Sequence, residues 1–72
     1  MKPDERAFLA ECQRCCANRP GREPPRDVYV RTGLNWKRAC YLLGKWADKG
    51  WYDYGVNVDL GWMTDEGLKV TP

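Results

Sequence analysis

The chain has 72 residues, 43% of them hydrophobic, with twelve Lys and Arg, ten Asp and Glu, and no His. A chain of this length forms one small domain, here residues 1–72, and its apolar share is too high for a disordered protein. No apolar run approaches the length of a transmembrane helix, and the N-terminal MKPDERAF lacks the hydrophobic segment of a signal peptide. We therefore expect a cytoplasmic protein without a membrane partner.

The residue types argue against catalysis. The sequence has neither His nor Ser, so the commonest general base and the serine nucleophile are both missing. Its seven glycines are scattered and form no phosphate-binding loop. We predict that the protein is not an enzyme and that it uses no cofactor.

Charge is divided unevenly along the chain. From Arg14 to Lys49 there are nine basic and three acidic residues, whereas Gly50 to Pro72 holds one basic and four acidic residues. A basic middle and an acidic end suggest that one side of the molecule binds a polyanion. Chance clustering of surface charge is the alternative.

The first helix is expected from about Pro3 to Asn18, with Asp4 at its positively polarised N-terminal end. The spacing of apolar residues predicts that this helix has one apolar and one polar face. The apolar face carries Phe8, Leu9, Cys12, Cys15 and Cys16, and the polar face carries Arg6, Gln13 and Arg14.

Four cysteines, Cys12, Cys15, Cys16 and Cys40, could in principle supply the ligands of a structural zinc. Three of them lie within one expected helix, however, and the adjacent pair Cys15-Cys16 is poorly placed to bind a single ion. Free cysteines that pack as small apolar side chains fit a reducing cytosol better. We expect no metal site and no disulfide.

Prolines interrupt the chain from Arg19 to Arg26 (RPGREPPR), where basic residues could reach a phosphate backbone or simply belong to a solvated linker. The next segment, Arg26 to Arg31 (RDVYVR), is rich in β-branched and aromatic residues, which favours a strand. We predict a short helix instead, because the turn at Thr32-Gly33-Leu34 leads into the next helix and would otherwise have no preceding helix to connect. Val28 and Leu34 would then face the core.

The stretch from Thr32 to Tyr52 contains the strongest helix signal. Asn35 is a good N-cap, and Gly50 suits the left-handed position just past the helix end. Apolar residues recur at helical spacing on one face, and charged or aromatic residues occupy the other. The apolar face carries Ala39, Leu43, Trp46 and Ala47, and the opposite face carries Lys37, Arg38, Tyr41, Lys45 and Asp48.

After Gly50 the aromatic and β-branched residues predict a hairpin that returns to the core. The expected strands are Trp51–Val56 and about Asp59–Met63, with a turn near Asn57. Gly55 and Gly61 are expected to mark bulges or close backbone approaches. A capped turn, Thr64–Gly67, should then pack Leu68 on the core.

The spacing from Gly33-Leu34 through Ala39, Leu43 and Trp46 to Lys49-Gly50-Trp51 resembles the second and third helices of winged helix-turn-helix DNA-binding domains. The resemblance covers about residues 26–68, and Met63–Gly67 is similar to the segment that often follows the wing. It implies an α+β fold, a three-helix bundle with a helix-turn-helix followed by a β-hairpin wing. For function, it implies sequence-specific duplex DNA binding through residues 35–49, in a small bacterial, phage or mobile-element transcription regulator or recombination accessory factor.

Long basic side chains on this helix are suited to guanine acceptors in the major groove, whereas flanking arginines would meet phosphates. By resemblance, Asn35 and Trp36 match positions that often touch DNA, although Trp36 could instead cover the core against the first helix. Gly44 lowers helix stability, so we expect another backbone or the DNA to approach it closely. A solvated helix surface is the alternative for the basic face. The expected DNA-binding residues are Arg26, Arg31, Thr32, Asn35, Trp36, Lys37, Arg38, Tyr41 and Lys45.

The expected wing departs from the family pattern. Wings that bind DNA usually carry Arg or Lys at the tip, yet residues 50–66 hold no basic residue, and Asp53 and Asp59 would repel phosphates. The wing could simply turn away from DNA. The alternative function is a winged-helix protein-interaction module that uses its acidic, apolar hairpin to bind a second copy or another protein.

Overall fold

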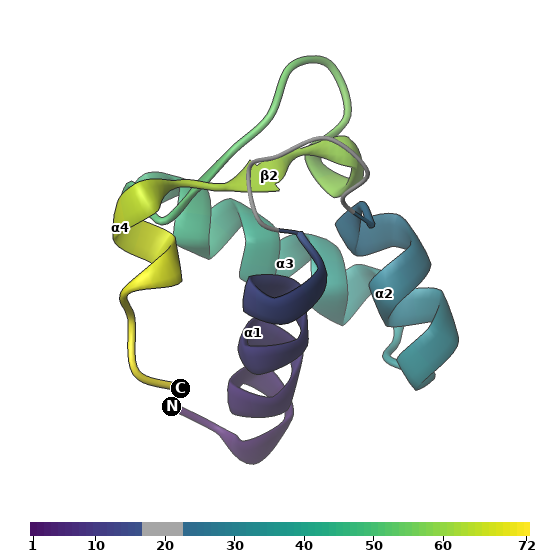
Figure 1. The fold of residues 1–72 in the computed structure, drawn as a ribbon. Coiled ribbons are helices and arrows are strands. Elements are labelled where there is room, and N and C mark those ends of the chain that lie inside the picture. Colours follow the sequence, from purple (N-terminus) through teal and green to yellow (C-terminus); the bar gives the residue numbers. More distant parts are fainter. Residues whose placement is uncertain (17–22) are drawn as a thin grey trace.

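The computed structural model describes residues 1–16 and 23–72. In this part of the chain, three helices are followed by a short antiparallel hairpin and a single-turn helix, so the predicted α+β class is confirmed. Figure 1 shows α1 in front of α3, with α2 and α4 on either side and the hairpin above. The elements are α1 (Pro3–Cys15), α2 (Pro25–Thr32), α3 (Trp36–Asp48), β1 (Tyr52–Asp53), the 3₁₀ turn η1 (Val58–Leu60), β2 (Trp62–Met63) and α4 (Asp65–Leu68).

The predicted helix end at Asn18 and the basic residues Arg19 and Arg22 of the expected linker lie outside the described residues. Across the described ranges, no helix combines the length and the apolar character that crossing a membrane requires.

Helix α1 begins with a proline, where the missing N–H costs no hydrogen bond, and two acids follow in its first turn. Of the predicted apolar face, Phe8, Leu9, Cys12 and Cys16 are buried, whereas Cys15 is half-buried. Gln13, however, is not a freely solvated residue of the polar face. Its side-chain amide donates hydrogen bonds to the carbonyl oxygens of Gly67 (2.9 Å) and Val70 (2.7 Å), which ties the C-terminal segment to α1.

The segment after the prolines is helical, as predicted. Helix α2 ends at Thr32 and is followed by Gly33, whose φ of +78° is the left-handed conformation that favours glycine. Asn35 then caps α3: its side-chain oxygen accepts hydrogen bonds from the backbone N–H groups of Lys37 (2.8 Å) and Arg38 (3.3 Å). A three-residue turn, residues 33–35, therefore joins α2 to α3 and fixes where α3 begins.

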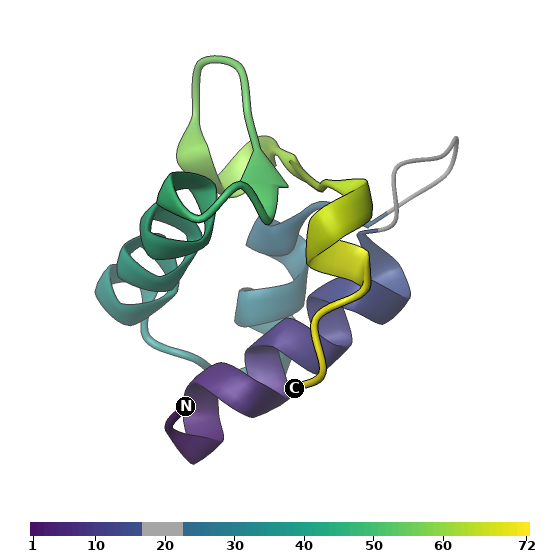
Figure 2. The same ribbon diagram turned by 90° about the vertical axis from the view of Figure 1, so that its left-hand side faces the viewer.

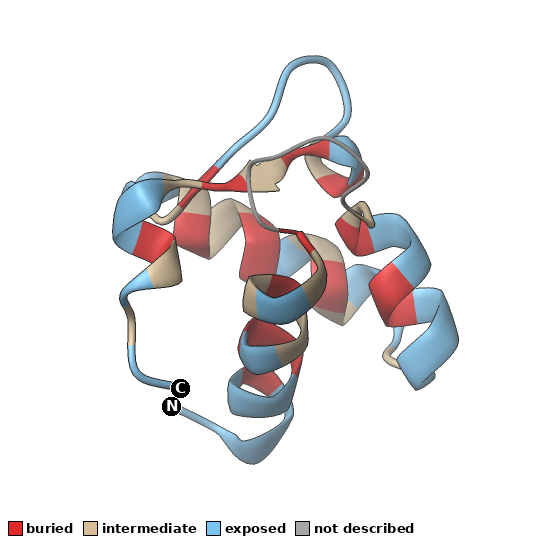
Figure 3. Ribbon diagram, in the orientation of Figure 1, coloured by how far each residue is buried: buried red, intermediate tan, exposed pale blue. Residues whose placement is uncertain are grey.

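The core lies where α1, α2, α3 and the hairpin meet, as the buried positions in Figure 3 show. Trp46 is completely buried, and its ring centroid lies 5.3 Å from that of Phe8. Val28 is buried as predicted, while Leu34 packs against the core and stays half-buried. Burial of such side chains is the main stabilising term in a domain of this size.

The hairpin is shorter than predicted. Each strand has only two residues, so the expectation of strands at Trp51–Val56 and Asp59–Met63 is wrong in length. Figure 2 shows the hairpin loop projecting beyond the helices. The pairs in register are Tyr52 with Met63 and Asp53 with Trp62.

The Tyr52 hydroxyl explains this early break in pairing. It donates a hydrogen bond to the carbonyl oxygen of Val58 (2.6 Å) and accepts one from the N–H of Gly61 (2.8 Å). These bonds hold the returning chain in the turn η1 rather than in a longer strand. A Cβ at Gly61 would overlap the carbonyl oxygen of Asp53, so the close backbone approach predicted there is confirmed.

The capped turn after the hairpin is also confirmed. The Thr64 hydroxyl accepts a hydrogen bond from the N–H of Gly67 at 3.0 Å, and Leu68 packs against the core. Gly67 itself lies against the backbone of Trp51, where a Cβ would overlap the carbonyl oxygen.

Candidate nucleic-acid interface

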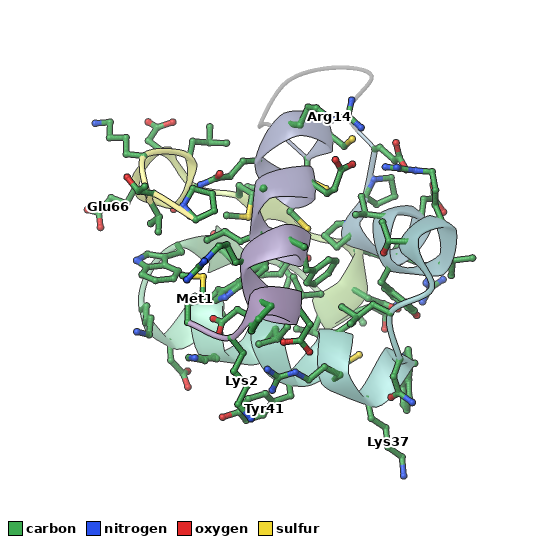
Figure 4. The ribbon with its side chains drawn as sticks, turned by 90° about the horizontal axis from the view of Figure 1, so that it is seen from below. Met1, Lys2, Arg14, Lys37, Tyr41 and Glu66 are labelled. Carbon is green, nitrogen blue, oxygen red and sulfur yellow. The ribbon has the colours of Figure 1, made fainter. Side chains whose placement is uncertain are left out.

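The outer face of α3 is open to solvent near the start of the helix. Trp36 is 58% exposed, and Lys37 and Tyr41 are exposed as well. Figure 4 shows Lys37 and Tyr41 projecting from one edge of the molecule, together with Lys2 from the beginning of the chain. The alternative in which Trp36 covers the core against the first helix is therefore wrong.

Arg38 lies on the flank of α3 that faces α1 and not in the middle of the outer face. It forms a forked ion pair with Asp4, with Nε 2.9 Å from Oδ2 and Nη2 3.1 Å from Oδ1. The hydrogen bonds from Arg38 hold the pKa of Asp4 below its ordinary value. The Arg38 side chain remains 28% exposed, and its Cζ lies 5.7 Å from the centre of the Tyr41 ring.

Lys45 is also directed toward α1. Its ammonium lies 3.0 Å from one oxygen of Glu5, and the indole N–H of Trp46 donates to the other oxygen at 2.9 Å. Glu5 is only 2% exposed. Burial raises the pKa of Glu5, but the hydrogen bonds from Trp46 and Lys45 outweigh burial and leave the pKa lowered. Lys45 therefore balances a buried charge, which corrects its expected placement on the free outer face.

The two arginines expected to meet phosphates are both ion-paired. Arg26 forms two hydrogen bonds with Asp59, at 3.0 Å from Nε and 3.2 Å from Nη2. Arg31 lies 3.1 Å from a carboxylate oxygen of Glu23 and 3.3 Å from one of Glu11. Both arginine side chains stay exposed over nearly half their surface. Arg26 lines a hollow together with Trp36 of α3, whereas the partners of Arg31 are Glu23 and the α1 residue Glu11, so the structure does not bring Arg31 to the outer face of α3.

Two further predicted contacts are polar groups at helix ends. The Thr32 hydroxyl donates to the carbonyl oxygen of Val28 at 2.9 Å, which satisfies an acceptor near the end of α2. The Asn35 side chain caps α3, as described above. Both residues are exposed at the turn that precedes the outer face of α3.

The hairpin is less acidic at its surface than the sequence indicates. Asp59 is 5% exposed, and besides its two bonds with Arg26 it lies 3.5 Å from the hydroxyl of Tyr29. Burial, and after it the charge of Asp59, raises the pKa of Tyr29. Of the two acids that were expected to repel phosphates, only Asp53 is exposed. The tip of the hairpin is apolar, with Val56 96% exposed.

Two open hollows lie between α3 and the hairpin, on either side of Cys40 and Tyr54. Their volumes are about 570 and 380 Å³. Gly44 faces the larger hollow, and nothing lies within 4 Å of the position that its Cβ would take. The expectation that another part of this chain's backbone approaches Gly44 is therefore wrong. The larger hollow is also lined by Tyr41, Lys45, Ala47, Asp48 and Lys49, and the smaller by Arg26, Trp36, Val56, Asn57, Val58 and Asp59.

The cysteines pack as apolar residues. Cys12 and Cys16 are buried, and the pKa of Cys12 is raised by its hydrogen bond with Cys16 and by burial. Burial also raises the pKa of Cys40. In residues 1–16 and 23–72, no three His, Cys, Asp or Glu side chains gather where they could hold a metal ion.

Sequence reasoning missed the part that α1 plays beside α3. Asp4 and Glu5 hold Arg38 and Lys45 across separations of 34 and 40 residues, and Lys2 projects from the same edge as Lys37. A signal existed in the two consecutive acids of the first turn of α1, since such acids complement the helix dipole but can also pair with a neighbouring basic helix. Local spacing did not indicate which helix that would be.

Comparison of the chain with protein-family models, with curated proteins and with solved structures finds no match.

Proposed function

We propose that this chain is a winged helix-turn-helix protein that binds duplex DNA, with α3 lying in the major groove. The observation that carries the proposal is the exposed outer face of a capped helix that follows a three-residue glycine turn. Trp36, Lys37 and Tyr41 lie exposed on that helix. An α-helix fits the major groove, and in helix-turn-helix units the second helix enters it.

The charges around this face support the same function. Lys2 and Lys37 form no ion pair within the described parts of the chain, so their ammonium groups are available to phosphate oxygens. Arg26 lies exposed beside Trp36, where a phosphate can take the place of the Asp59 carboxylate. Such contacts position a protein on DNA and supply salt-dependent affinity without reading sequence.

The proposed biological setting comes from the resemblance of the helical spacing. A domain of this kind suits a small transcription regulator or a recombination accessory factor of a bacterium, phage or mobile element. In either setting the protein acts by occupying a DNA site and not by catalysis.

A binding titration tests this proposal. The affinity for a randomised duplex is measured at several salt concentrations, and we expect it to fall steeply as salt rises. Lys37→Ala should weaken binding and lower the salt slope by about one. Lys69→Ala is the matched control, because Lys69 is also exposed but follows α4 and should leave the slope unchanged. Absence of salt-dependent duplex binding by the wild-type protein would contradict the proposal.

A second candidate function is protein binding through the hairpin. The observation that favours it is the apolar tip, where Val56 is exposed beside Tyr54 and next to a hollow that also includes Trp36. Sedimentation over a range of concentrations tests the simplest case, association of two copies. Association that disappears in Val56→Ser while duplex binding persists would support it, and a monomer at every concentration would count against it.

A further inference from the structure

The carboxylate of Asp4 and the guanidinium of Arg38 meet between the first turns of α1 and α3. Asp4 accepts hydrogen bonds from Nε and Nη2 of Arg38, at 2.9 and 3.1 Å. This geometry fixes one edge of the planar guanidinium. The Tyr41 ring, 5.7 Å from Cζ, limits it on another side.

The paired arginine keeps three of its five N–H donors. Asp4 takes the N–H of Nε and one N–H of Nη2, which leaves both N–H groups of Nη1 and one of Nη2. Two of these donors, one on Nη1 and one on Nη2, point along the outer Nη1–Nη2 edge of the guanidinium, and the third points from Nη1 back toward Cδ. Because the side chain is still 28% exposed, that edge can reach a group outside the protein.

We propose that Asp4 is a positioning residue that holds Arg38 so that its Nη1–Nη2 edge meets O6 and N7 of a guanine in the major groove. This inference rests on the proposed DNA binding and names a base that the site reads. An arginine bonded to guanine in this way makes two parallel hydrogen bonds, which is the commonest specific contact to a base. An arginine that is already ordered loses less conformational freedom when it binds.

The surroundings of the pair fit this role. Lys2 lies two residues before Asp4, Lys37 directly precedes Arg38, and neither lysine forms an ion pair in the described residues, so phosphates can be held next to the base that Arg38 reads. The competing role for Asp4 is simple repulsion of phosphates, in which it would weaken binding to every sequence equally. The two roles predict opposite effects when the carboxylate is removed.

Selection from a pool of randomised duplexes distinguishes them. The bound duplexes are sequenced for wild type, Arg38→Ala, Asp4→Ala and Asp4→Asn. We expect the wild-type motif to include a guanine whose preference over other bases, roughly 5- to 150-fold, is lost in Arg38→Ala. Both Asp4 variants should weaken the preference at the same position and leave the other positions of the motif unchanged. Glu66→Gln removes one negative charge on a different side of the molecule and should leave the motif intact.

The outcomes separate this inference from the function on which it rests. Wild-type protein that binds no duplex overturns both. Wild-type protein that binds duplexes but enriches no guanine dependent on Arg38 overturns the inference alone. Tighter binding of the Asp4 variants to all duplexes, with an unchanged motif, would show that Asp4 acts only by repulsion and would also overturn it. Thermal unfolding of each variant checks that the fold is kept, and Asp4→Asn preserves the shape of the side chain.

Discussion

The buried carboxylate of Glu5 accepts a hydrogen bond from the indole nitrogen of Trp46 at 2.9 Å, which links the first turn of α1 to the centre of the core. Lys45 supplies the opposite charge from the exposed side, 3.0 Å away. A charge that is 2% exposed persists only when such partners satisfy it. The pair therefore fixes how α1 crosses α3, and with it the place of Asp4 beside Arg38.

Replacement of Glu5 by Ala should lower the free energy of unfolding by roughly 3 kcal/mol, because two hydrogen bonds to a charged group are lost and the buried N–H of Trp46 is left unpaired. Glu5→Gln should cost less, since its amide oxygen can still accept from Trp46. Urea unfolding followed by circular dichroism measures both. Glu66→Gln, an exposed acid in α4, is the control and should change stability by less than about 0.5 kcal/mol. Equal stability of Glu5→Ala and the control would show that the buried contact contributes nothing.

Lowering the pH should weaken the contacts that the Glu5 carboxylate makes with Trp46 and Lys45. The folded pKa of Glu5 is lowered, so the unfolded chain binds the proton more readily and stability rises with pH across this range. The contribution of Glu5 is thus complete above its unfolded pKa of about 4.3 and is lost as pH falls through the folded pKa. The difference in unfolding free energy between wild type and Glu5→Gln should be constant from about pH 7 to 5 and shrink below about 4. The stability of Glu5→Gln should still fall somewhat in acid, because the pKa values of Asp4 and Glu11 are also lowered in the folded protein. A difference that stays constant down to about pH 3 would contradict this assignment.

The local features of the fold could be predicted because each depends on neighbouring residues. The Asn35 cap and the Thr64 cap are contacts over two or three positions, and the helical face of α3 is set by periodicity. The strand lengths could not be predicted in this way. They depend on one hydroxyl, that of Tyr52, which bonds to residues six and nine positions away and bends the chain out of the ladder.

The sequence predicted which basic residues lie on or near α3, but it did not predict which of them pair with an acid. Arg26, Arg38 and Lys45 are all basic residues near α3, but each has an acid that lies 33 to 40 residues away in sequence. Periodicity gives the direction of a side chain along its own helix and carries no information about the helix packed against it. Only the tertiary structure shows that Lys2 and Lys37, unlike Arg26, Arg38 and Lys45, form no ion pair within the described residues.

Gly44 should be replaceable at no cost to the fold. The sequence suggests that another backbone or DNA approaches this glycine closely, yet apart from its chain neighbours and the backbone of its own helix no atom lies within 4 Å of its Cβ position. Gly44→Ala should therefore raise the free energy of unfolding by roughly 0.5–1 kcal/mol, as expected for an open helix position. Gly61→Ala is the matched contrast and should be destabilising, because the added carbon would overlap the carbonyl oxygen of Asp53. Thermal unfolding of the two variants compares them directly, and a lower Tm for Gly44→Ala would contradict the open geometry.

Asp59 should act as a structural residue of the hairpin. The sequence places it among exposed acids, and its replacement by Asn would then only remove repulsion from DNA. In the fold it is 5% exposed and receives two hydrogen bonds from Arg26. Asp59→Asn removes the charge that Arg26 balances, so we expect the free energy of unfolding to fall by roughly 1–3 kcal/mol.

The matched control for Asp59 is Asp53→Asn, which removes the same charge from an exposed position of the same hairpin. Asp53 forms no ion pair within residues 1–16 and 23–72, so this change should alter stability by less than about 0.5 kcal/mol. Urea unfolding measures the two variants under identical conditions. Since η1 packs against both α2 and α3, loss of the Asp59 contact should also loosen the hairpin and speed hydrogen exchange at the N–H of Leu60, which bonds to the carbonyl oxygen of Asn57. Equal stability of the two variants would mean that the bonds to Arg26 do not hold the hairpin, and that its position depends on Tyr52 and the apolar contacts alone.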